Sequence, residues 1–255
     1  MEGLRVNAGG VKAHRAKIRA GSAIAALFAV ALAAGPAFAA GATPDISGIY
    51  WATTYSPKIQ LVGGGELPFT PEGKAAYEKN IAALKDGSLI DAARKFCTPD
   101  GVPRVLATPY PFEILHGAPG QTLLMYELNH QIRRVAMDQP LQSYEELIAL
   151  PWYNGHSVGR WEGDTLVIQT RGFNDRTFLD ATGVPHTDMM VTTERLRKIS
   201  PTQLENVVTI HDPDYFTRDW QARFTYTLRN DIRMEDYLCG EEHRDISSVA
   251  GVRRP

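Results

Sequence analysis

The chain has 255 residues, of which 44% are hydrophobic and 22% are charged, and its formal net charge is −2. This balance is typical of a globular protein and excludes a chain that is disordered throughout. The length suits one domain or two tightly joined domains.

The first 39 residues have the pattern of a secretory signal peptide. A basic leader precedes an uncharged run from Ser22 to Ala39, which ends in the small residues Ala37-Phe38-Ala39. An uncleaved membrane anchor is the alternative, but the run has 18 residues and is interrupted by Gly35-Pro36, so it is a poor permanent span. We therefore expect cleavage before Ala40, a periplasmic or secreted protein, and no membrane span after cleavage.

Removal of the leader would make the chain more acidic. The leader holds five of the 27 Lys and Arg residues and one of the 29 Asp and Glu residues, which leaves a formal charge of −6. A protein that binds nucleic acid needs a basic surface, so we expect no nucleic-acid partner.

The exported part begins with a short strand and one clear helix. The stretch Asp45 to Trp51 reads as a strand. After a Gly-rich loop, Thr70 can cap a helix whose first turn contains Pro71 and Glu72, and Gly87 stands where the helix should stop. The Pro-rich stretches that follow cannot be helix interior. We expect residues 40–255 to form a single mainly β domain, in which residues 40–120 wrap around the body.

From Gln121 onward the pattern is one of consecutive strands. Residues 222–228 alternate apolar and polar side chains, which is typical of a strand with one wet face. Asn129-His130 and Asn230-Asp231 predict tight turns, "SYEELIAL" predicts one or two helical turns, and "DIRMEDYLC" predicts a last strand. Short connections favour an antiparallel meander. We expect it to close or curl into a small, lipocalin-like barrel, because closure removes exposed sheet edges.

The stretch "GHSVGRWEGDTLVIQT", residues 155–170, predicts a β-hairpin. Gly163 supplies a positive φ at the turn and Asp164 can bond to the turn backbone. We therefore interpret Glu162 and Asp164 as turn residues rather than catalytic acids, with Trp161 covering the turn. "GHSVG" also matches the G-x-S-x-G pattern of α/β-hydrolases, but a β-turn follows where that pattern needs a helix.

Cys97 and Cys239 are the two cysteines of the chain. An even number of cysteines in an exported protein favours a disulfide, which would tie the Pro-rich wrapping segment to the last strand. Two buried thiols are the alternative, and the wide spacing does not match a metal or redox motif.

The hairpin motif, together with "GFND", "PHTDMMVTTERLR", "HDPDYFTRDW" and "YLCGEEH", resembles a family of exported, largely uncharacterised bacterial proteins. The resemblance spans most of residues 45–239 and implies export and a shared fold more than a reaction. The chain departs from the family pattern in two places. His211 stands where an acid is expected, and "CGEEH" replaces a histidine directly after the cysteine.

The candidates for chemistry are histidines and acids near the predicted strand ends. His156 begins the hairpin, and His186 with Asp188 precedes the next strand. A histidine beside a carboxylate can act as an acid or base near neutral pH, so we predict these three residues as catalytic. A buried polar network that only stabilises the barrel is the alternative. No HExxH or HxH spacing occurs, so we expect no metal and no cofactor. The alternative is a metal site whose ligands come together from separate strands.

Several aromatic and acidic residues could complete a pocket. We predict the following ligand-binding residues: Trp152, Tyr153, Trp161, Asp175 and Glu194. Such a pocket would suit an apolar or aromatic small molecule.

These patterns favour an exported protein with a pocket for a small organic ligand. It could be a cofactor-free acid/base enzyme, such as an isomerase, dehydratase or hydrolase. The alternatives are a non-catalytic periplasmic binding protein and an envelope-associated partner protein. A perturbed histidine beside a carboxylate in a closed pocket would favour the enzyme, and a deep apolar pocket without such a pair would favour the binding protein.

Overall fold

The computed structural model describes residues 44–117, 119–147, 152–237 and 239. These residues all belong to one compact unit, Ala42–Pro255. The predicted signal peptide, residues 1–39, lies outside the described part of the chain. None of the helices in that part combines the length and hydropathy needed to span a bilayer.

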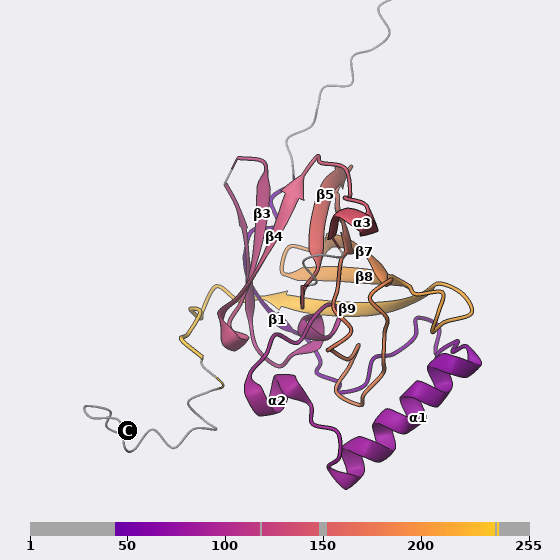
Figure 1. Ribbon diagram of the computed structural model, residues 1–255. Helices are drawn as coiled ribbons and strands as arrows, with labels where there is room; N and C mark the ends of the chain where they lie inside the picture. Colours follow the sequence, from indigo (N-terminus) through magenta and orange to yellow (C-terminus); the bar gives the residue numbers. More distant parts are fainter. Residues whose placement is uncertain (1–43, 118, 148–151, 238, 240–255) are drawn as a thin grey trace, which may run out of the picture. The chain divides into compact units, whose positions relative to one another are not determined.

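The body of the protein is a closed barrel of nine strands, each paired with its neighbours in sequence order (Figure 1). The closing pair is β1 with β9. This confirms the mainly β, closed-barrel prediction. The strands are β1 Gly48–Ala52, β2 Phe112–His116, β3 Gln121–Tyr126, β4 Gln131–Met137, β5 His156–Glu162, β6 Thr165–Arg171, β7 Val191–Ser200, β8 Gln203–His211 and β9 Trp220–Leu228.

One pairing departs from the expected antiparallel meander, because β4 and β5 are parallel. The reason is parity. Nine strands form a closed ring, and strand direction cannot alternate all the way around a ring with an odd number of members. A parallel pair needs a connection that runs back along the barrel, and residues 138–155 supply it. This connection carries the short helix α3, Tyr144–Leu147, within the predicted "SYEELIAL" segment.

The directions of the strands give the barrel two different ends. The long connections 53–111, 172–190 and 212–219 lie at one end, which we call the loop end. The tight turns 117–120, 163–164 and 201–202 lie at the other, which we call the turn end. Since functional sites are usually built from loops on a rigid scaffold, the loop end is the place to look for one.

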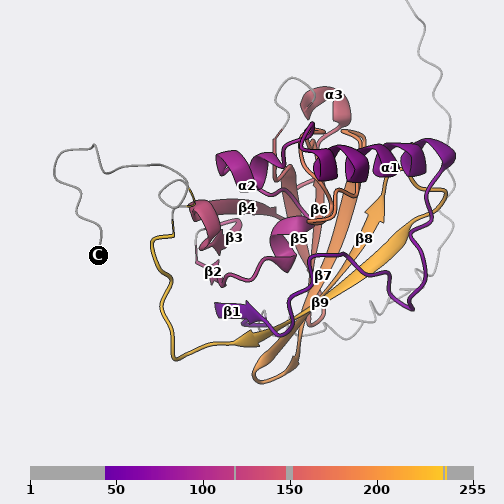
Figure 2. The ribbon, with the colours of Figure 1, turned by 90° about the horizontal axis from the view of Figure 1, so that it is seen from below.

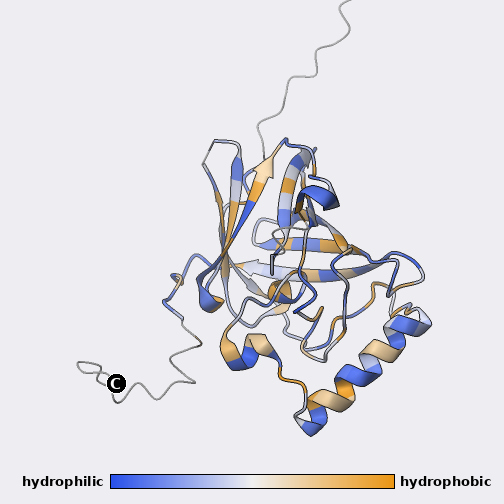
Figure 3. Cartoon of the chain, viewed as in Figure 1, coloured by the Kyte–Doolittle hydropathy of each residue, from blue (hydrophilic) through white to orange (hydrophobic). Residues whose placement is uncertain are grey.

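Side chains inside the barrel form the core. Burial alternates along β8 and along most of β7, and the same alternation is visible as hydropathy stripes in Figure 3. Aromatic rings fill much of the interior. The centroid of the Phe112 ring lies 4.8 Å from that of the Tyr226 ring and 5.8 Å from that of the Tyr50 ring. Burial raises the pKa of Tyr50 to about 12.

The predicted helix is α1, Pro71–Asp86. Thr70 accepts a hydrogen bond from the backbone of Gly73, and Gly87 adopts a φ of 80° directly after the last turn. Gly73 also lets the helix approach the connection 212–219, since a Cβ there would lie 2.2 Å from the carbonyl oxygen of Tyr215. Figures 1 and 2 show α1 outside the barrel.

A short 3₁₀ helix, η1 (Arg104–Ala107), closes the loop end. Val105 and Leu106 are buried in the barrel core, and the Tyr226 hydroxyl donates to the Leu106 carbonyl from inside. The helix α2, Ala92–Phe96, precedes η1, and a second 3₁₀ helix, η2 (Leu128–His130), joins β3 to β4. In Figure 1, α2 lies below the barrel strands.

The segment 40–120, which was expected to wrap around the body, also supplies the barrel strands β1 and β2. One expectation about this part of the fold was wrong. The described part of "DIRMEDYLC" forms no strand. The reason is that β9 already pairs with β8 and β1, so the closed barrel offers no free edge to a further strand.

Candidate functional site

The β5–β6 hairpin is formed as predicted, with Gly163 at a φ of 63° in its turn. Asp164 accepts a hydrogen bond from the Thr165 hydroxyl at 2.9 Å. Glu162 is held by Arg195 at 2.9 Å and by Arg160 at 2.6 Å, and these bonds lower the pKa of its carboxyl. Both acids therefore have structural roles at the turn end.

His156 lies on the outer face of the barrel. Ser157 and Gly159 point inward along β5, so the alternating His156 points out, and its ring contacts Trp152 edge-on at 4.9 Å. Burial lowers the pKa of His156. The residue sits at the loop end, as the hairpin geometry predicts, but it does not line the barrel interior.

His186 is buried, with 4% of its surface exposed. Its Nδ1 lies 2.9 Å from the carbonyl oxygen of Thr187, which can only accept, so Nδ1 carries the hydrogen. Nε2 then accepts from the Thr177 hydroxyl at 2.8 Å. Burial lowers the pKa of this imidazole, which is stable in its neutral form.

Asp188 does not bond to His186. Its carboxylate accepts a hydrogen bond from the Tyr144 hydroxyl at 2.6 Å. The residue next to His186, Thr187, is held by Asp212 instead, through its backbone at 2.7 Å and its hydroxyl at 2.8 Å. The structure thus brings the three predicted catalytic residues to the same end of the barrel without forming the predicted histidine–carboxylate pair.

Glu194 belongs to a polar network inside the barrel. Its carboxylate pairs with Arg133 at 2.5 Å and accepts from Asn206 at 2.8 Å. Arg133 also donates to Ser157 at 2.9 Å and to Thr170 at 2.6 Å. None of the four cavities described for this protein is lined by these five side chains. The carboxylate of Glu194 is thus engaged in the core, and its role as a ligand contact stays a prediction.

The other predicted ligand contacts are dispersed. Trp152 is 51% exposed beside His156, and Asp175 lines a small cavity of about 140 Å³ with Tyr144 and Asp188. Trp161 packs near the turn end, where its ring lies 5.9 Å from that of His116. These residues do not share one pocket.

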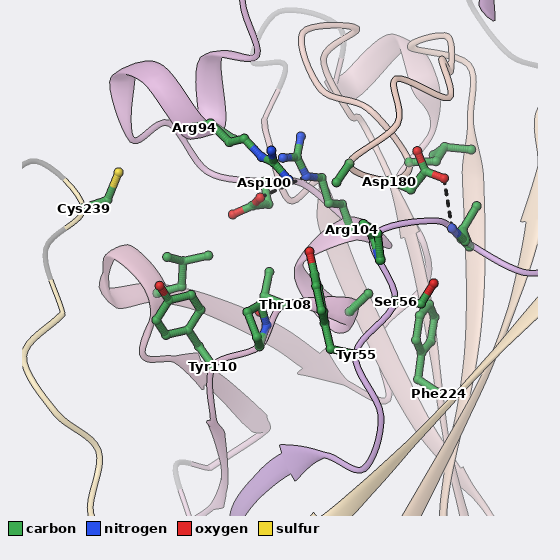
Figure 4. Close-up of a pocket in the computed structure, with 18 of the residues that line it drawn as sticks. Tyr55, Ser56, Arg94, Asp100, Arg104, Thr108, Tyr110, Asp180, Phe224 and Cys239 are labelled. Carbon is green, nitrogen blue, oxygen red and sulfur yellow. Dashed lines mark hydrogen bonds and ion pairs between the residues drawn. The ribbon is translucent and has the colours of Figure 1, made fainter. Parts of the chain in front are cut away.

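A cavity with a larger volume than that beside Asp175 lies outside η1 at the loop end. This site, the η1 cavity, has a volume of about 340 Å³ (Figure 4). Its walls come from the connection after β1, from α2, η1 and β9, and from the C-terminal segment. Apolar and aromatic lining residues include Tyr55, Ile59, Tyr110, Leu179, Phe224 and Tyr237, and its charged lining residues are Arg94, Asp100, Arg104 and Asp180.

Arg104 is the centre of the charged wall, and it is 7% exposed. Its two terminal nitrogens form a fork with Asp91 at 2.7 and 3.0 Å, and its Nε lies 3.1 Å from Asp100. Asp91 also caps α2 by accepting from the backbone of Ala93. Burial raises the pKa of Asp100, against the opposing effect of Arg104.

Asp180 holds two connections together at the edge of this cavity. It accepts from the Ile59 backbone at 2.9 Å, which is the dashed contact in Figure 4. It also accepts from the backbone and the hydroxyl of Thr182, both at 2.8 Å. These bonds fix the position of the carboxylate beside the cavity.

The predicted disulfide between Cys97 and Cys239 is confirmed, with 5.6 Å between the two Cα atoms. It joins the end of α2 to the C-terminal segment after β9, rather than to a last strand. The Tyr237 ring in that segment lies tilted against the Tyr110 ring, with 4.6 Å between the ring centroids. Because Cys239, Tyr237 and α2 all line the η1 cavity, the disulfide ties two of its walls together.

Sequence reasoning missed this site because it read "CTPDGVPR" as a Pro-rich wrap. The signal in the sequence was the pair Asp100 and Arg104, which stand on either side of Gly101 in an otherwise uncharged stretch. Gly101 has a φ of 78°, and a Cβ there would lie 2.7 Å from Thr177 Oγ1 and 3.0 Å from the Tyr153 carbonyl. The glycine thus lets the segment carrying Asp100 and Arg104 pack against the loop end.

No protein-family model matches this sequence, and the search of curated proteins finds no match. Among solved structures, the crystal structure of a mutant of the fluorescent protein UnaG is similar at 13% identity. The match covers 73% of this chain and 97% of that one, with a TM-score of 0.34. That score is too low for the likeness to bear on function.

Proposed function

We propose that the protein binds a small organic molecule with an apolar or aromatic body in the η1 cavity. The observation that carries the proposal is the combination of a 340 Å³ cavity, aromatic and aliphatic walls, and a buried Asp–Arg cluster. Binding sites are commonly concave, mostly apolar and equipped with a few fixed polar groups. The η1 cavity lies against a rigid scaffold, which is the end of the barrel that η1 closes.

The proposal is binding rather than catalysis. Both ring nitrogens of His186 are engaged by Thr177 and Thr187, and Asp188 is engaged by Tyr144. A catalytic role for His156, His186 and Asp188 stays a prediction that does not enter this proposal.

Export and the resemblance to the exported bacterial family are part of the same proposal. The Cys97–Cys239 disulfide supports an oxidising compartment, and the basic leader supports secretion. Intact-mass measurement of the natural protein should give a chain that begins near Ala40. A natural chain that keeps its full leader would contradict export by cleavage.

The binding proposal is tested with N-phenylnaphthylamine, a neutral dye whose fluorescence rises in apolar sites. Wild-type protein should bind it saturably. Ala93→Phe should weaken binding by about tenfold or more, since Ala93 lines the cavity from α2 and a ring there would occupy ligand volume.

Ala92→Phe is the matched control, because Ala92 lies on the same helix but does not line the cavity. It should bind the dye like wild type. Absence of saturable binding by wild type, or equal effects of the two substitutions, would overturn the proposed site.

A further inference from the structure

The wall of the η1 cavity has an excess of buried negative charge. Asp100 and Asp180 line the cavity with the buried Arg104, and Asp91 lies behind them, bonded to the same guanidinium. The second arginine of the lining, Arg94, has 63% of its side chain exposed and lies 3.6 Å from Asp91. Water screens an exposed guanidinium, so it compensates little of the charge inside.

The three carboxylates differ in how well they are compensated. Asp91 takes both ends of the Arg104 fork, and Asp180 accepts several hydrogen bonds from Ile59 and Thr182. Asp100 is 5% exposed and contacts the same guanidinium through its Nε alone. Burial raises the pKa of Asp100, against the opposing effects of Arg104 and of the Gln131 side chain, so burial disfavours the ionised form of this carboxyl.

The opposite side of the cavity is aromatic. Figure 4 shows Asp100 beside Arg104, with Tyr55 and Tyr110 across the cavity and their hydroxyl groups turned toward the charged wall. Phe224 adds a third ring from β9. Phenolic oxygens can accept hydrogen bonds from an ammonium group, and the carboxylate opposite them supplies the counter-charge.

We propose that the ligand of the η1 cavity is an organic cation, a protonated amine on an aromatic or aliphatic body, whose ammonium group pairs with Asp100. This inference rests on the proposed binding function and names its ligand class. An anionic ligand is disfavoured, because the guanidinium of Arg104 is already engaged by Asp91 and Asp100.

A metal ion fits the site less well than an organic cation. Among the described residues, no three His, Cys, Asp or Glu side chains form a group that could hold a metal. Around Arg104, the guanidinium stands between the carboxylates and occupies the position that a shared metal would need. The apolar volume beside Asp100 suits the body of an organic ligand instead.

The test uses three probes with one ring system and different head groups: naphthylethylamine, naphthylethanol and naphthylpropanoate. Each displaces N-phenylnaphthylamine from wild-type protein at neutral pH. The amine should displace the dye at about a tenfold lower concentration than the alcohol, and the propanoate should be weakest.

Asp100→Asn should reduce the advantage of the amine over the alcohol to less than about threefold, since the amide keeps the shape and removes the charge. Asp214→Asn is the matched control, because Asp214 lies at the same end of the barrel, in the connection 212–219, but does not line the η1 cavity. It should keep the full advantage. Circular dichroism confirms that each variant is folded, and the dye affinity of each variant corrects its competition curves.

The outcomes separate this inference from the proposed function. Dye binding without an amine preference in wild type overturns the cationic class and leaves the binding function standing, whatever the variants do. An amine preference that survives in folded Asp100→Asn overturns the role of Asp100. Failure of the dye and all three probes to bind overturns the proposed function and the inference together.

Discussion

Replacing both cysteines, Cys97→Ala with Cys239→Ala, should destabilise the protein and weaken binding in the η1 cavity. The disulfide joins residues 142 positions apart. In the chain-entropy description, opening a loop of that length returns about 17 cal/mol/K to the unfolded chain, or about 5 kcal/mol at room temperature. Losses of native disulfides usually fall between about 2 and 5 kcal/mol, which sets the expected range.

The local consequence follows from how the C-terminal segment is held. Beyond β9, the Glu235 backbone donates to Glu127 at 2.8 Å and the Cys239 backbone donates to Asn129 at 3.3 Å. The Tyr237 ring packs at a tilt against that of Tyr110. The disulfide is the covalent link among these contacts. Without it, the wall formed by Tyr237 and Cys239 should separate from α2, so the affinity for N-phenylnaphthylamine should fall several-fold.

The assay is urea unfolding of oxidised wild type and of the double variant, analysed by linear extrapolation, with dye titration on both folded proteins. Thiol counting under denaturing conditions first verifies that wild type has no free thiol. A stability loss below about 1 kcal/mol would refute the loop-closure reasoning. Unchanged dye affinity would refute the role of the disulfide in the cavity wall.

Two further predictions concern the barrel. Glu194→Gln should lower the free energy of unfolding by about 3–5 kcal/mol in the urea assay, because it leaves the Arg133 guanidinium buried without its counter-charge. Adding Arg133→Met should recover much of this loss, since it removes the unpaired charge. A loss below about 1 kcal/mol in Glu194→Gln would contradict the reasoning. Since burial lowers the pKa of His186, its contribution to stability is present above its ordinary pKa of about 6.5 and is lost as pH falls toward the folded-state value. Between about pH 6.5 and 5, the free energy of unfolding of wild type should therefore fall more steeply with pH than that of His186→Gln, by up to about 1.4 kcal/mol per pH unit. Equal slopes of the two stability curves would show that His186 does not titrate in this way.

Features decided by neighbouring residues could be predicted from the sequence. Thr70 and Gly87 bound α1 because a cap bonds within a turn and a positive φ favours glycine. Gly163 marks the hairpin turn for the same local reason. The alternation along β9 predicted a strand with one buried face, and consecutive strands predicted the closed barrel.

The candidate site could be predicted only in part. The expectation of export and the even cysteine count predicted the disulfide pair, but not that it closes a cavity wall. His156, His186 and Asp188 do reach the same end of the barrel, yet Asp188 bonds to Tyr144 and His186 to Thr177. Side-chain partners depend on contacts between distant segments, which alternation and spacing do not encode.

The sequence by itself determined the local elements of this protein: the capped helix, the hairpin turns and the faces of the strands, because each depends on residues within one or two turns of the chain. The tertiary structure alone decided the rest. The odd number of strands makes β4 and β5 parallel, and closure of β1 on β9 leaves no edge for a tenth strand. Asp100, Arg104 and Asp180 line one cavity because η1 and the connection 172–190 pack on the same barrel end, a juxtaposition across some 80 residues that local physics cannot set.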